Sequence, residues 1–327
     1  MKKIIVVFPE RLGDAIFCTP ALALLKQYSP LDLIDAIVMS PITADMLKNN
    51  PGINKIFIMP NEDIFQSLHK SYDVAINLHY GSIRDEQLSF LADHFISIEA
   101  PDFNLHQSLQ ALAFIQYYVN YPVNNHIKHS YCLYPKKNDE QRILNFLNEY
   151  PIDAQLNKLI GLHLGCHRIA NKKIWKIFSR STHKKVWPIK KFIKLAKTLL
   201  QQNPHFRFVL TGSNSEQYLA KKFLTKIPQS IDLIGKTSVL ELTALMNYLN
   251  LYITSDTGPL HVACATDVNL IALFGSHTSF IRTGPYPPKQ NQKLVYHSEI
   301  AKISVNEVIQ SIHALLASRI SSFYNFE

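Results

Sequence analysis

The stretch LYITSDTGPLH, residues 251–261, carries the clearest signal of how this chain folds. Its first part, Leu251–Thr254, is an apolar, β-branched run typical of a buried strand. Small and polar residues follow at once, and Gly258-Pro259 opens a helix with proline in its first turn, where the missing N–H costs no hydrogen bond. A strand that passes through a short polar turn into a helix is the repeating unit of parallel α/β sheets.

The same alternation extends over the rest of the 327-residue chain. The regular order of strand and helix favours parallel sheets covered by helices on both faces. The other expected strands are Ile4–Phe8, Ile34–Met39, Lys55–Met59, Val74–Leu78, Phe95–Ile98, Leu159–Leu164, Arg207–Thr211, Ile231–Ile234 and Leu270–Phe274. The expected helices are Ala15–Tyr28, Pro41–Asn49, Ile64–Lys70, Arg84–Ala92, Ile189–Gln202, Ser215–Lys226, Val239–Asn247 and Val305–Ala317.

A chain of this length has room for two domains, each with its own hydrophobic core. The two half-chains therefore predict an α/β protein with two doubly wound parallel-sheet domains, residues 1–150 and 151–327, and a C-terminal helix in the second. We expect the domains to face each other across a cleft, with ligands bound beyond the carboxyl ends of the strands.

Composition narrows the class of protein. Hydrophobic residues make up 47% of the chain and charged residues 18%, a balance typical of globular proteins. The N-terminal apolar run, Ile4–Phe8, is too short for a secretion signal, and no run approaches the roughly 18 residues of a membrane span. We therefore expect a cytoplasmic protein. Free thiols are expected because no metal-ligand or disulfide spacing relates the four cysteines, Cys18, Cys132, Cys166 and Cys264.

Positive charge is concentrated in one region of the chain. There are 34 Lys and Arg against 25 Asp and Glu, yet no acidic residue lies between Asp153 and Glu216, an interval that holds 13 of the basic residues. Such a patch attracts nucleic acid, an anionic membrane surface or a phosphorylated substrate, although it can also be an ordinary solvated face. Its aromatic residues, Trp175, Phe178 and Trp187, suit base stacking, lipid contact or anchoring to the core.

Three segments follow an expected strand and precede a helix, which places their polar residues at the ligand-binding edge of a sheet. In the first, PERLGD at residues 9–14, Gly13 permits a tight turn and Asp14 begins the next helix. Asp14 can cap that helix by accepting backbone N–H bonds. It can also act as a base that removes a proton from a substrate hydroxyl.

The second and third segments suit the two ends of a nucleoside diphosphate. In TSDTGPLH at residues 254–261, backbone N–H groups and the helix dipole favour a pyrophosphate. His261, one turn into the helix, can donate to a phosphate oxygen or serve a structural role. In TGSNSE at residues 211–216, Glu216 can complete a capping box or accept hydrogen bonds from both ribose hydroxyls.

Several common nucleotide-binding motifs do not occur in the sequence. Neither G-x-G-x-x-G nor G-x-x-x-x-G-K-[ST] is present, which argues against a dinucleotide dehydrogenase and a P-loop enzyme. No D-x-D occurs, so we expect no Mg²⁺ site for a diphosphate. Charge on a departing diphosphate would then be met by helix N-termini and by Lys or Arg.

Together, these segments resemble the lipopolysaccharide heptosyltransferases of glycosyltransferase family 9. RLGD at 11–14 and TPAL at 19–22 resemble the family's Gly-Asp and Thr-Pro-x-Leu opening. SDTGPLHVA at 255–263, LFGS at 273–276, TGPY at 283–286 and KVWP at 185–188 resemble its second half. The resemblance implies a GT-B fold of two Rossmann-like domains, the first binding the acceptor and the second the nucleotide sugar.

The resemblance also implies an activity and roles for residues. The activity is inverting transfer of a heptose from ADP-L-glycero-β-D-manno-heptose to a hydroxyl of the lipopolysaccharide inner core, without metal or other cofactor. Asp14 becomes the general base, and Lys185 neutralises the charge that grows on the diphosphate. Donor binding falls to Gly13, Lys185, Glu216, Asp256, Thr257, Gly258 and His261.

The sequence departs from the family pattern at two places. His277-Thr278-Ser279 stands where family members have a Thr-Asp-Pro-like run, which puts the donor contacts of that loop in question. The stretch from Cys166 to Lys184 is longer and more basic than the family loop. We expect it to engage acceptor phosphates or the anionic inner face of the inner membrane, where the protein would be peripheral. The expected acceptor and phosphate patch comprises Arg11, Arg168, Lys172, Lys173, Lys176 and Arg180.

Three other functions remain open at this point. A GT-B transferase or epimerase that uses another nucleotide sugar would share the fold, because backbone groups often make much of the base recognition. A nucleic-acid-binding protein would use the basic patch, but the patch contains no recognisable nucleic-acid module and we expect no such partner. A catalytically silent relative would have kept the fold alone.

Overall fold

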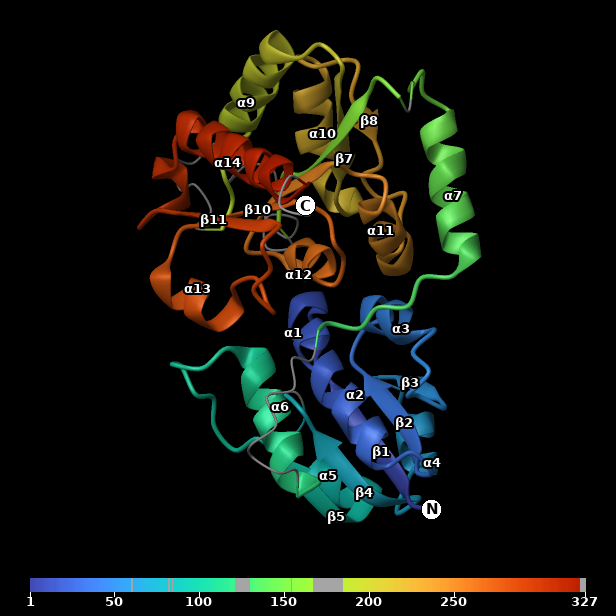
Figure 1. Ribbon diagram of the computed structural model, residues 1–327. Coiled ribbons are helices and arrows are strands. Elements are labelled where there is room, and N and C mark those ends of the chain that lie inside the picture. Colours follow the sequence, from blue (N-terminus) through green and yellow to red (C-terminus); the bar gives the residue numbers. More distant parts are fainter. Residues whose placement is uncertain are drawn as a thin grey trace. The chain divides into compact units, whose positions relative to one another are not determined.

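The computed structural model describes residues 1–59, 61–81, 83, 85–120, 130–153, 155–166 and 185–323, with the backbone alone for 317–323. Contacts divide the chain into two units, whose helices and strands are labelled in Figure 1. The first comprises Met1–Lys136, Ser238–Leu240 and Ile281–Pro287. The second comprises Lys137–Thr237, Glu241–Phe280 and Pro288–Glu327.

A five-stranded parallel sheet forms the frame of the first unit. Its strands are β1 (Lys3–Phe8), β2 (Leu33–Val38), β3 (Ile56–Ile58), β4 (Tyr72–Asn77) and β5 (Ala92–Ser97), in the order β3-β2-β1-β4-β5. Strands β1 and β4 are paired from Ile4–Val74 to Val7–Asn77, so the loops that follow them leave the same edge of the sheet side by side. The helices are α1 (Leu12–Phe17), α2 (Thr19–Tyr28), α3 (Pro41–Leu47), α4 (Glu62–Ser67), α5 (Asp85–Leu91) and α6 (Gln107–Tyr118).

The helix expected at Ala15–Tyr28 is two helices, α1 and α2, that meet at Cys18. Pro20 has no N–H to donate to the carbonyl of Ile16, so one helical hydrogen bond cannot form. The hydroxyl of Thr19 donates to the Ile16 carbonyl oxygen instead, at 2.8 Å. The break makes α1 a separate short helix directly after β1.

The second unit contains a six-stranded parallel sheet. Its strands are β6 (Lys158–His163), β7 (Phe206–Thr211), β8 (Ile231–Asp232), β9 (Leu251–Ser255), β10 (Leu270–Phe274) and β11 (Gln292–Tyr296), in the order β11-β10-β9-β6-β7-β8. The neighbours β9, β6 and β7 bring the loops after these strands together at one edge. The helices are α7 (Lys137–Asn148), α9 (Ile189–Gln202), α10 (Gln217–Leu224), α11 (Val239–Met246), α12 (Gly258–Cys264), α13 (His277–Thr283) and α14 (Val305–Phe323), with short 3₁₀ turns η2 (Asn214–Glu216) and η3 (Ile300–Lys302).

The two units do not divide where the sequence-based boundary at 150 places them. Contacts assign α7 to the second unit, and its Arg142 Nε lies 3.0 Å from Glu241 Oε1 on α11. Two short segments, 238–240 and 281–287, return to the first unit from the second half of the chain. Strand and helix periodicity cannot reveal such crossings, because they depend on long-range contacts.

The KVWP segment anchors α9 to the core of the second unit. Trp187 has no exposed surface, and its indole N–H donates to the carbonyl of Ile303 at 3.0 Å. Lys191 Nζ donates to the carbonyls of Ala301 and Ile303, each at 2.6 Å. The interpretation of Trp187 as a core anchor is therefore confirmed, whereas Trp175 and Phe178 lie outside the described residues.

Across the described parts of the chain, every helix is too short or too polar to traverse a bilayer.

Candidate active site

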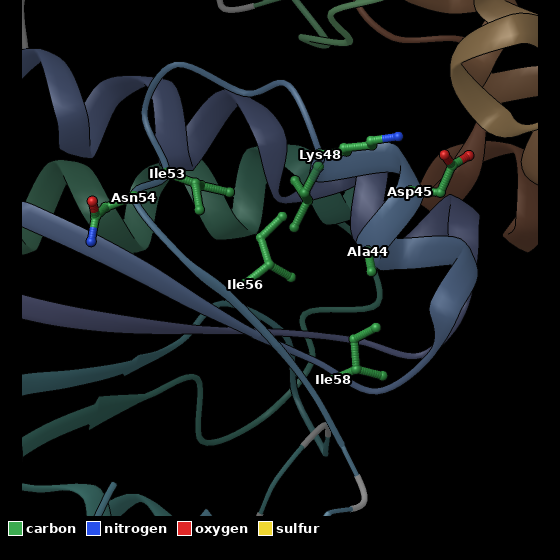
Figure 2. Close-up of a pocket in the computed structure, with 8 residues that line it drawn as sticks. Ala44, Asp45, Lys48, Ile53, Asn54, Ile56 and Ile58 are labelled. Carbon is green, nitrogen blue, oxygen red and sulfur yellow. The ribbon is translucent and has the colours of Figure 1, made fainter. Parts of the chain in front are cut away.

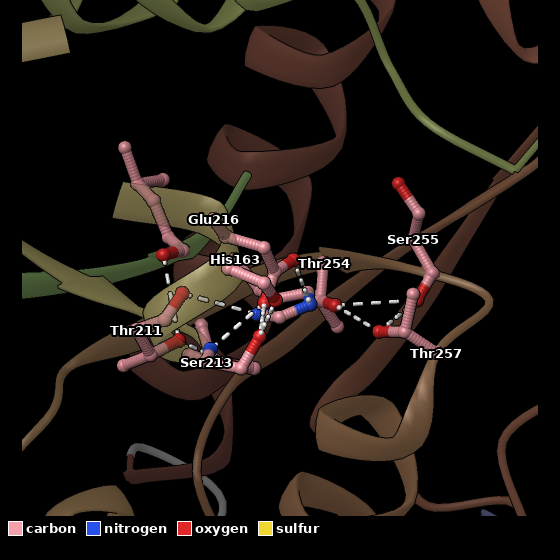
Figure 3. A network of polar contacts seen from close by, with 10 residues as sticks. His163, Thr211, Ser213, Glu216, Thr254, Ser255 and Thr257 are labelled. Carbon is pink, nitrogen blue, oxygen red and sulfur yellow. Dashed lines mark hydrogen bonds and ion pairs between the residues drawn. The ribbon is translucent and has the colours of Figure 1, made fainter. Parts of the chain in front are cut away.

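The carboxyl edge of β6, β7 and β9 gathers most of the residues expected to bind a nucleotide sugar. Figure 3 shows the side chains that meet there, including His163 at the end of β6 and Thr211 at the end of β7. Glu216 follows β7 on η2, and Thr257 follows β9. Parallel strands that end at one edge explain why these distant positions are close neighbours.

Glu216 is held by a set of short contacts (Figure 3). Glu216 is 3% exposed. Its Oε2 accepts hydrogen bonds from the backbone N–H of Ser213 at 2.8 Å and from the Ser213 hydroxyl at 2.9 Å. Ser213 and Glu216 thereby form a capping box. The structural alternative for Glu216 is thus confirmed, while its contact with ribose stays a prediction.

The second carboxylate oxygen, Oε1, points into a tight space. It is buried and accepts no hydrogen bond from the described residues, and His163 Nε2 lies 3.6 Å from it. The opposite ring nitrogen, Nδ1, lies 3.1 Å from the Thr211 carbonyl oxygen, which can only accept, so Nδ1 carries the proton. A Cβ on Gly165 would overlap Oε1, so glycine is needed there for the carboxylate to fit.

Lys185 and Asp256 form an ion pair. Lys185 Nζ lies 2.5 Å from Asp256 Oδ2, and the side chains are 42% and 7% exposed. The buried carboxylate fixes the ammonium group directly before the first turn of α12. This contact brings together two residues, 71 positions apart in sequence, that the family resemblance assigned to the donor.

The N-terminus of α12 lacks a side-chain cap. Thr257 occupies the N-cap position, but its hydroxyl makes no hydrogen bond to the helix N–H groups. It donates instead to the Ser255 carbonyl at 3.2 Å and lies 3.2 Å from Thr254 Oγ1. Gly258 is the first residue of the helix, and His261, the fourth, is 2% exposed. Pro259 has no N–H and the Leu260 N–H donates to the Thr257 carbonyl at 3.0 Å, so an anion at the start of α12 would meet the N–H of Gly258.

Asp14, the expected base, lies in the first turn of α1 in the first unit. Its interpretation as an N-cap is wrong, because Arg11 occupies that position and Asp14 is the third residue of the helix. Gly13 is the second helical residue, so the tight turn expected there is part of α1. Asp14 is half-buried and Arg11 is exposed.

His79 is a neighbour of Asp14 that the sequence did not reveal. Burial lowers the pKa of His79, the Asp14 carboxylate opposes this shift, and the guanidinium groups of Arg282 and Arg11 add to it. All four residues belong to the first unit. His79 follows β4 as Asp14 follows β1, so only the β1–β4 pairing could have linked the two residues.

Comparison with known proteins gives the family. The model of glycosyltransferase family 9 (heptosyltransferase) matches residues 136–313, more than half of the chain. The chain belongs to glycosyltransferase family 9. It is therefore a glycosyltransferase, as the motifs in its two halves suggested.

Individual members of the family are similar to this chain, in sequence or in structure, over most of its length. It is 24% identical over 295 residues to lipopolysaccharide heptosyltransferase 1 of Campylobacter coli, with 85% of each chain covered. The glycosyltransferase family 9 structure from Veillonella parvula is similar with a TM-score of 0.78 at 20% identity, covering 97% of this chain and 98% of that one. The E. coli ADP-heptose lps heptosyltransferase II structure has a TM-score of 0.74 at 19% identity, covering 97% and 99%. The GT-B prediction of two parallel-sheet domains is confirmed.

Some predicted residues of the family 9 site are not described. Arg168, Lys172, Lys173, Lys176 and Arg180 lie outside the described residues. Lys190, Lys194 and Lys197 are exposed on α9, whereas Lys185 pairs with Asp256 and Lys191 donates to backbone carbonyls. The described part of the basic region, from Lys185 onward, is therefore not uniformly exposed to solvent.

A pocket of about 500 Å³ lies along α3 and the edge strand β3 in the first unit (Figure 2). None of the predicted site residues lines it. Its walls are largely aliphatic, and Asp45 and Lys48 are the titratable residues among them, so nothing in the pocket points to glycosyl transfer. The lining residues are Ala44, Asp45, Leu47, Lys48, Ile53, Asn54, Ile56 and Ile58.

Proposed function

We propose that this family 9 enzyme transfers a heptose, with inversion, from ADP-L-glycero-β-D-manno-heptose to a hydroxyl of the lipopolysaccharide inner core. The observation that carries the proposal is the family match over residues 136–313. The acceptor is proposed because the Campylobacter coli relative is named a lipopolysaccharide heptosyltransferase. The donor is proposed because the E. coli structure is named an ADP-heptose lps heptosyltransferase.

The donor diphosphate would lie at Lys185, Thr257 and Gly258. The proposal is supported by the Lys185 ammonium group, which Asp256 holds, and by the N-terminus of α12, which has no side-chain cap. Positive charge and N–H groups set in place beforehand stabilise a leaving diphosphate more than mobile water does. His261 and Asp256 complete the proposed donor site, with Glu216 and Gly13 assigned to it by the family resemblance.

The Asp14 carboxylate would act as the general base. It would take the proton of the acceptor hydroxyl as that oxygen forms a bond to the anomeric carbon. The bond between the anomeric carbon and the diphosphate oxygen would break on the opposite side, so that ADP leaves with the bonding electrons. The configuration at the anomeric carbon is thereby inverted.

Metal-independent transfer is part of the proposal. Lys185 and the N-terminus of α12 would meet the charge that a magnesium ion meets in other transferases. Within the described ranges, no three His, Cys, Asp or Glu side chains gather in a group suited to a metal ion.

The acceptor would be a phosphorylated, lipid-linked saccharide, met at the inner face of the inner membrane by a cytoplasmic, peripheral enzyme. The excess of basic residues between Asp153 and Glu216 supports this assignment, and we propose no nucleic-acid partner. Cosedimentation with vesicles containing anionic lipid should fall as salt rises, because charge attraction is screened. Binding that ignored both salt and anionic lipid would contradict the membrane contact.

Calorimetric titration of the purified protein with ADP, UDP, GDP and NAD, with and without Mg²⁺, tests the donor. We expect a clear preference for ADP that Mg²⁺ does not change. Preference for UDP or GDP would contradict ADP-heptose as the donor and would indicate a transferase or epimerase that uses another nucleotide sugar. Binding of none would favour a catalytically silent or nucleic-acid-binding protein, which oligonucleotide titration would then separate.

A further inference from the structure

Residues 281–287 form an arm that returns to the first unit and is fixed there by aromatic contacts. His106 Nε2 donates to the Gly284 carbonyl oxygen at 3.1 Å, and the His106 ring stacks on Tyr286 with centroids 5.0 Å apart. Tyr131 packs against the same Tyr286 ring at 5.7 Å. The arm is thus held by the first unit, although it lies in the second half of the sequence.

Arg282 is carried on this arm in a half-buried position. Its guanidinium carbon lies 4.7 Å from the centroid of the Phe103 ring, a cation–π contact that orients the planar group. Its Nε is buried and donates no hydrogen bond to any described residue. A buried guanidinium donor that lacks an acceptor is rare in folded proteins, and a bound oxyanion is one way to supply the acceptor.

Arg282 and the proposed base, Asp14, both exert an electrostatic effect on His79. The thiol of Cys18 lies 3.4 Å from the Asp14 carbonyl oxygen and 3.8 Å from that of Leu78, so the turn carrying Asp14 abuts the turn carrying His79. The charges of Arg282 and Arg11 lower the pKa of His79, and the charge of Asp14 raises it. The charged side chains that shift the pKa of His79 are thus two guanidinium groups and one carboxylate, so positive charge is in excess among them.

We propose that Arg282, together with Arg11, binds an anionic substituent of the acceptor, a carboxylate or a phosphate, next to the hydroxyl that Asp14 deprotonates. The inference rests on the proposed function and adds the residue that selects an acidic acceptor. The planar guanidinium fork of Arg282, already oriented by Phe103, suits two parallel hydrogen bonds to such an oxyanion. The acceptor, rather than the donor, is assigned because Phe103 and His79 both belong to the unit that carries Asp14.

Steady-state kinetics of Arg282→Gln tests the proposal with ADP-heptose and a truncated, heptose-free lipopolysaccharide acceptor. We expect the KM for the acceptor to rise about tenfold or more, as for a lost hydrogen bond to a charged group, while the Kd for ADP stays unchanged. Arg282→Lys keeps the charge without the fork and should fall between wild type and Arg282→Gln. Arg207→Gln is the matched control, since Arg207 lies on β7 in the second unit and donates to the carbonyls of Pro204 and Phe206.

The outcomes separate this inference from the proposed function. Wild-type transfer combined with an unchanged acceptor KM in Arg282→Gln would overturn the inference alone, and a weakened ADP Kd would reassign Arg282 to the donor. Absence of wild-type transfer would overturn the proposed function. Phosphatase treatment of the acceptor identifies the anion: if phosphate is bound, the treated acceptor loses its sensitivity to Arg282→Gln, and if a carboxylate is bound, the sensitivity remains.

A binding measurement does not depend on turnover or on the stability of the variant. Inorganic phosphate and acetate are titrated into wild-type protein with ¹⁵N-labelled histidine, and the His79 ring signal is assigned with His79→Asn. An anion between the two guanidinium groups should raise the pKa of His79, because it offsets the positive charges of Arg282 and Arg11, which lower that pKa. The Asp14 carboxylate already raises it. A His79 signal unchanged by both anions would contradict the proposal.

Discussion

Asp14 is the residue on which the chemistry depends most directly. We predict that Asp14→Asn lowers turnover about a hundredfold or more, because a general base contributes about that much and an amide cannot accept the acceptor proton. The Kd for ADP should stay unchanged, since Asp14 lies in the first unit while the proposed diphosphate residues, Lys185, Thr257 and Gly258, lie in the second. Transfer assays and ADP calorimetry measure the two effects.

Asp63 provides a control for this substitution. It occupies the first turn of α4, as Asp14 occupies the first turn of α1. Asp63→Asn should leave turnover at the wild-type level. Full turnover in Asp14→Asn would remove Asp14 as the base.

Lys185 tests the diphosphate site. We predict that Lys185→Ala weakens ADP binding about tenfold or more, because a charge-assisted contact to the diphosphate is lost. Lys289→Ala is the control, since Lys289 also pairs with an aspartate, at 3.1 Å from Asp267 Oδ1, but in a different loop. ADP affinity and turnover unchanged in Lys185→Ala would contradict its role.

The sequence revealed only part of the site at this scale. Asp14, Lys185 and the Asp256–His261 run lie in recognisable segments, so their importance could be predicted from the residues themselves. The ion pair of Lys185 with Asp256 could not be predicted. Nor could the electrostatic effects of Asp14 and Arg282 on His79. Each depends on which strands are neighbours or on a chain crossing, and local patterns do not encode these contacts.

At the scale of elements, α9 and β10 begin and end where the sequence predicted, because amphipathic and β-branched periodicity is strong there. The break between α1 and α2 was missed because the apolar pattern continues across Cys18 while Pro20 removes a donor. Helix α6 and strand β11 were missed too. Strand β11 lies at the edge of its sheet and is only partly buried, so its apolar alternation is weak.

His106 links α6 to the returning arm. Its Nδ1 accepts from the Ser108 N–H at 3.1 Å as the cap of α6, while its Nε2 donates to Gly284. Burial lowers the pKa of His106 to about 4, although the bond to Gly284 opposes the shift. Protonation would remove the lone pair that caps α6.

This link predicts a loss of stability in mild acid. Since the unfolded chain binds a proton at His106 near pH 6.5 and the folded chain only near pH 4, stability is lost as pH falls between these values. The loss is about 2 kcal/mol at pH 5. Urea unfolding at pH 7.5 and pH 5 should show this fall in wild type and a smaller one in His106→Asn. Equal pH dependence in the two proteins would contradict the assignment.

At the scale of the whole molecule, two parallel-sheet units provide the proposed base and the proposed diphosphate site separately. We predict that EDTA leaves the transfer rate unchanged, because in the proposed mechanism Lys185 and the N-terminus of α12 stabilise the leaving diphosphate in place of a metal ion. Rates with EDTA and with added Mg²⁺ measure this. A rate that EDTA abolishes and Mg²⁺ restores would contradict the metal-independent mechanism.

The most direct measurement is the transfer reaction itself. Purified protein is incubated with ADP-L-glycero-β-D-manno-heptose and heptose-free lipopolysaccharide, and the saccharide product is analysed by mass spectrometry and NMR. We predict that the acceptor gains heptose in the α configuration while an equal amount of ADP is released. An acceptor unchanged by ADP-heptose but glycosylated from a UDP- or GDP-sugar would contradict the proposed function.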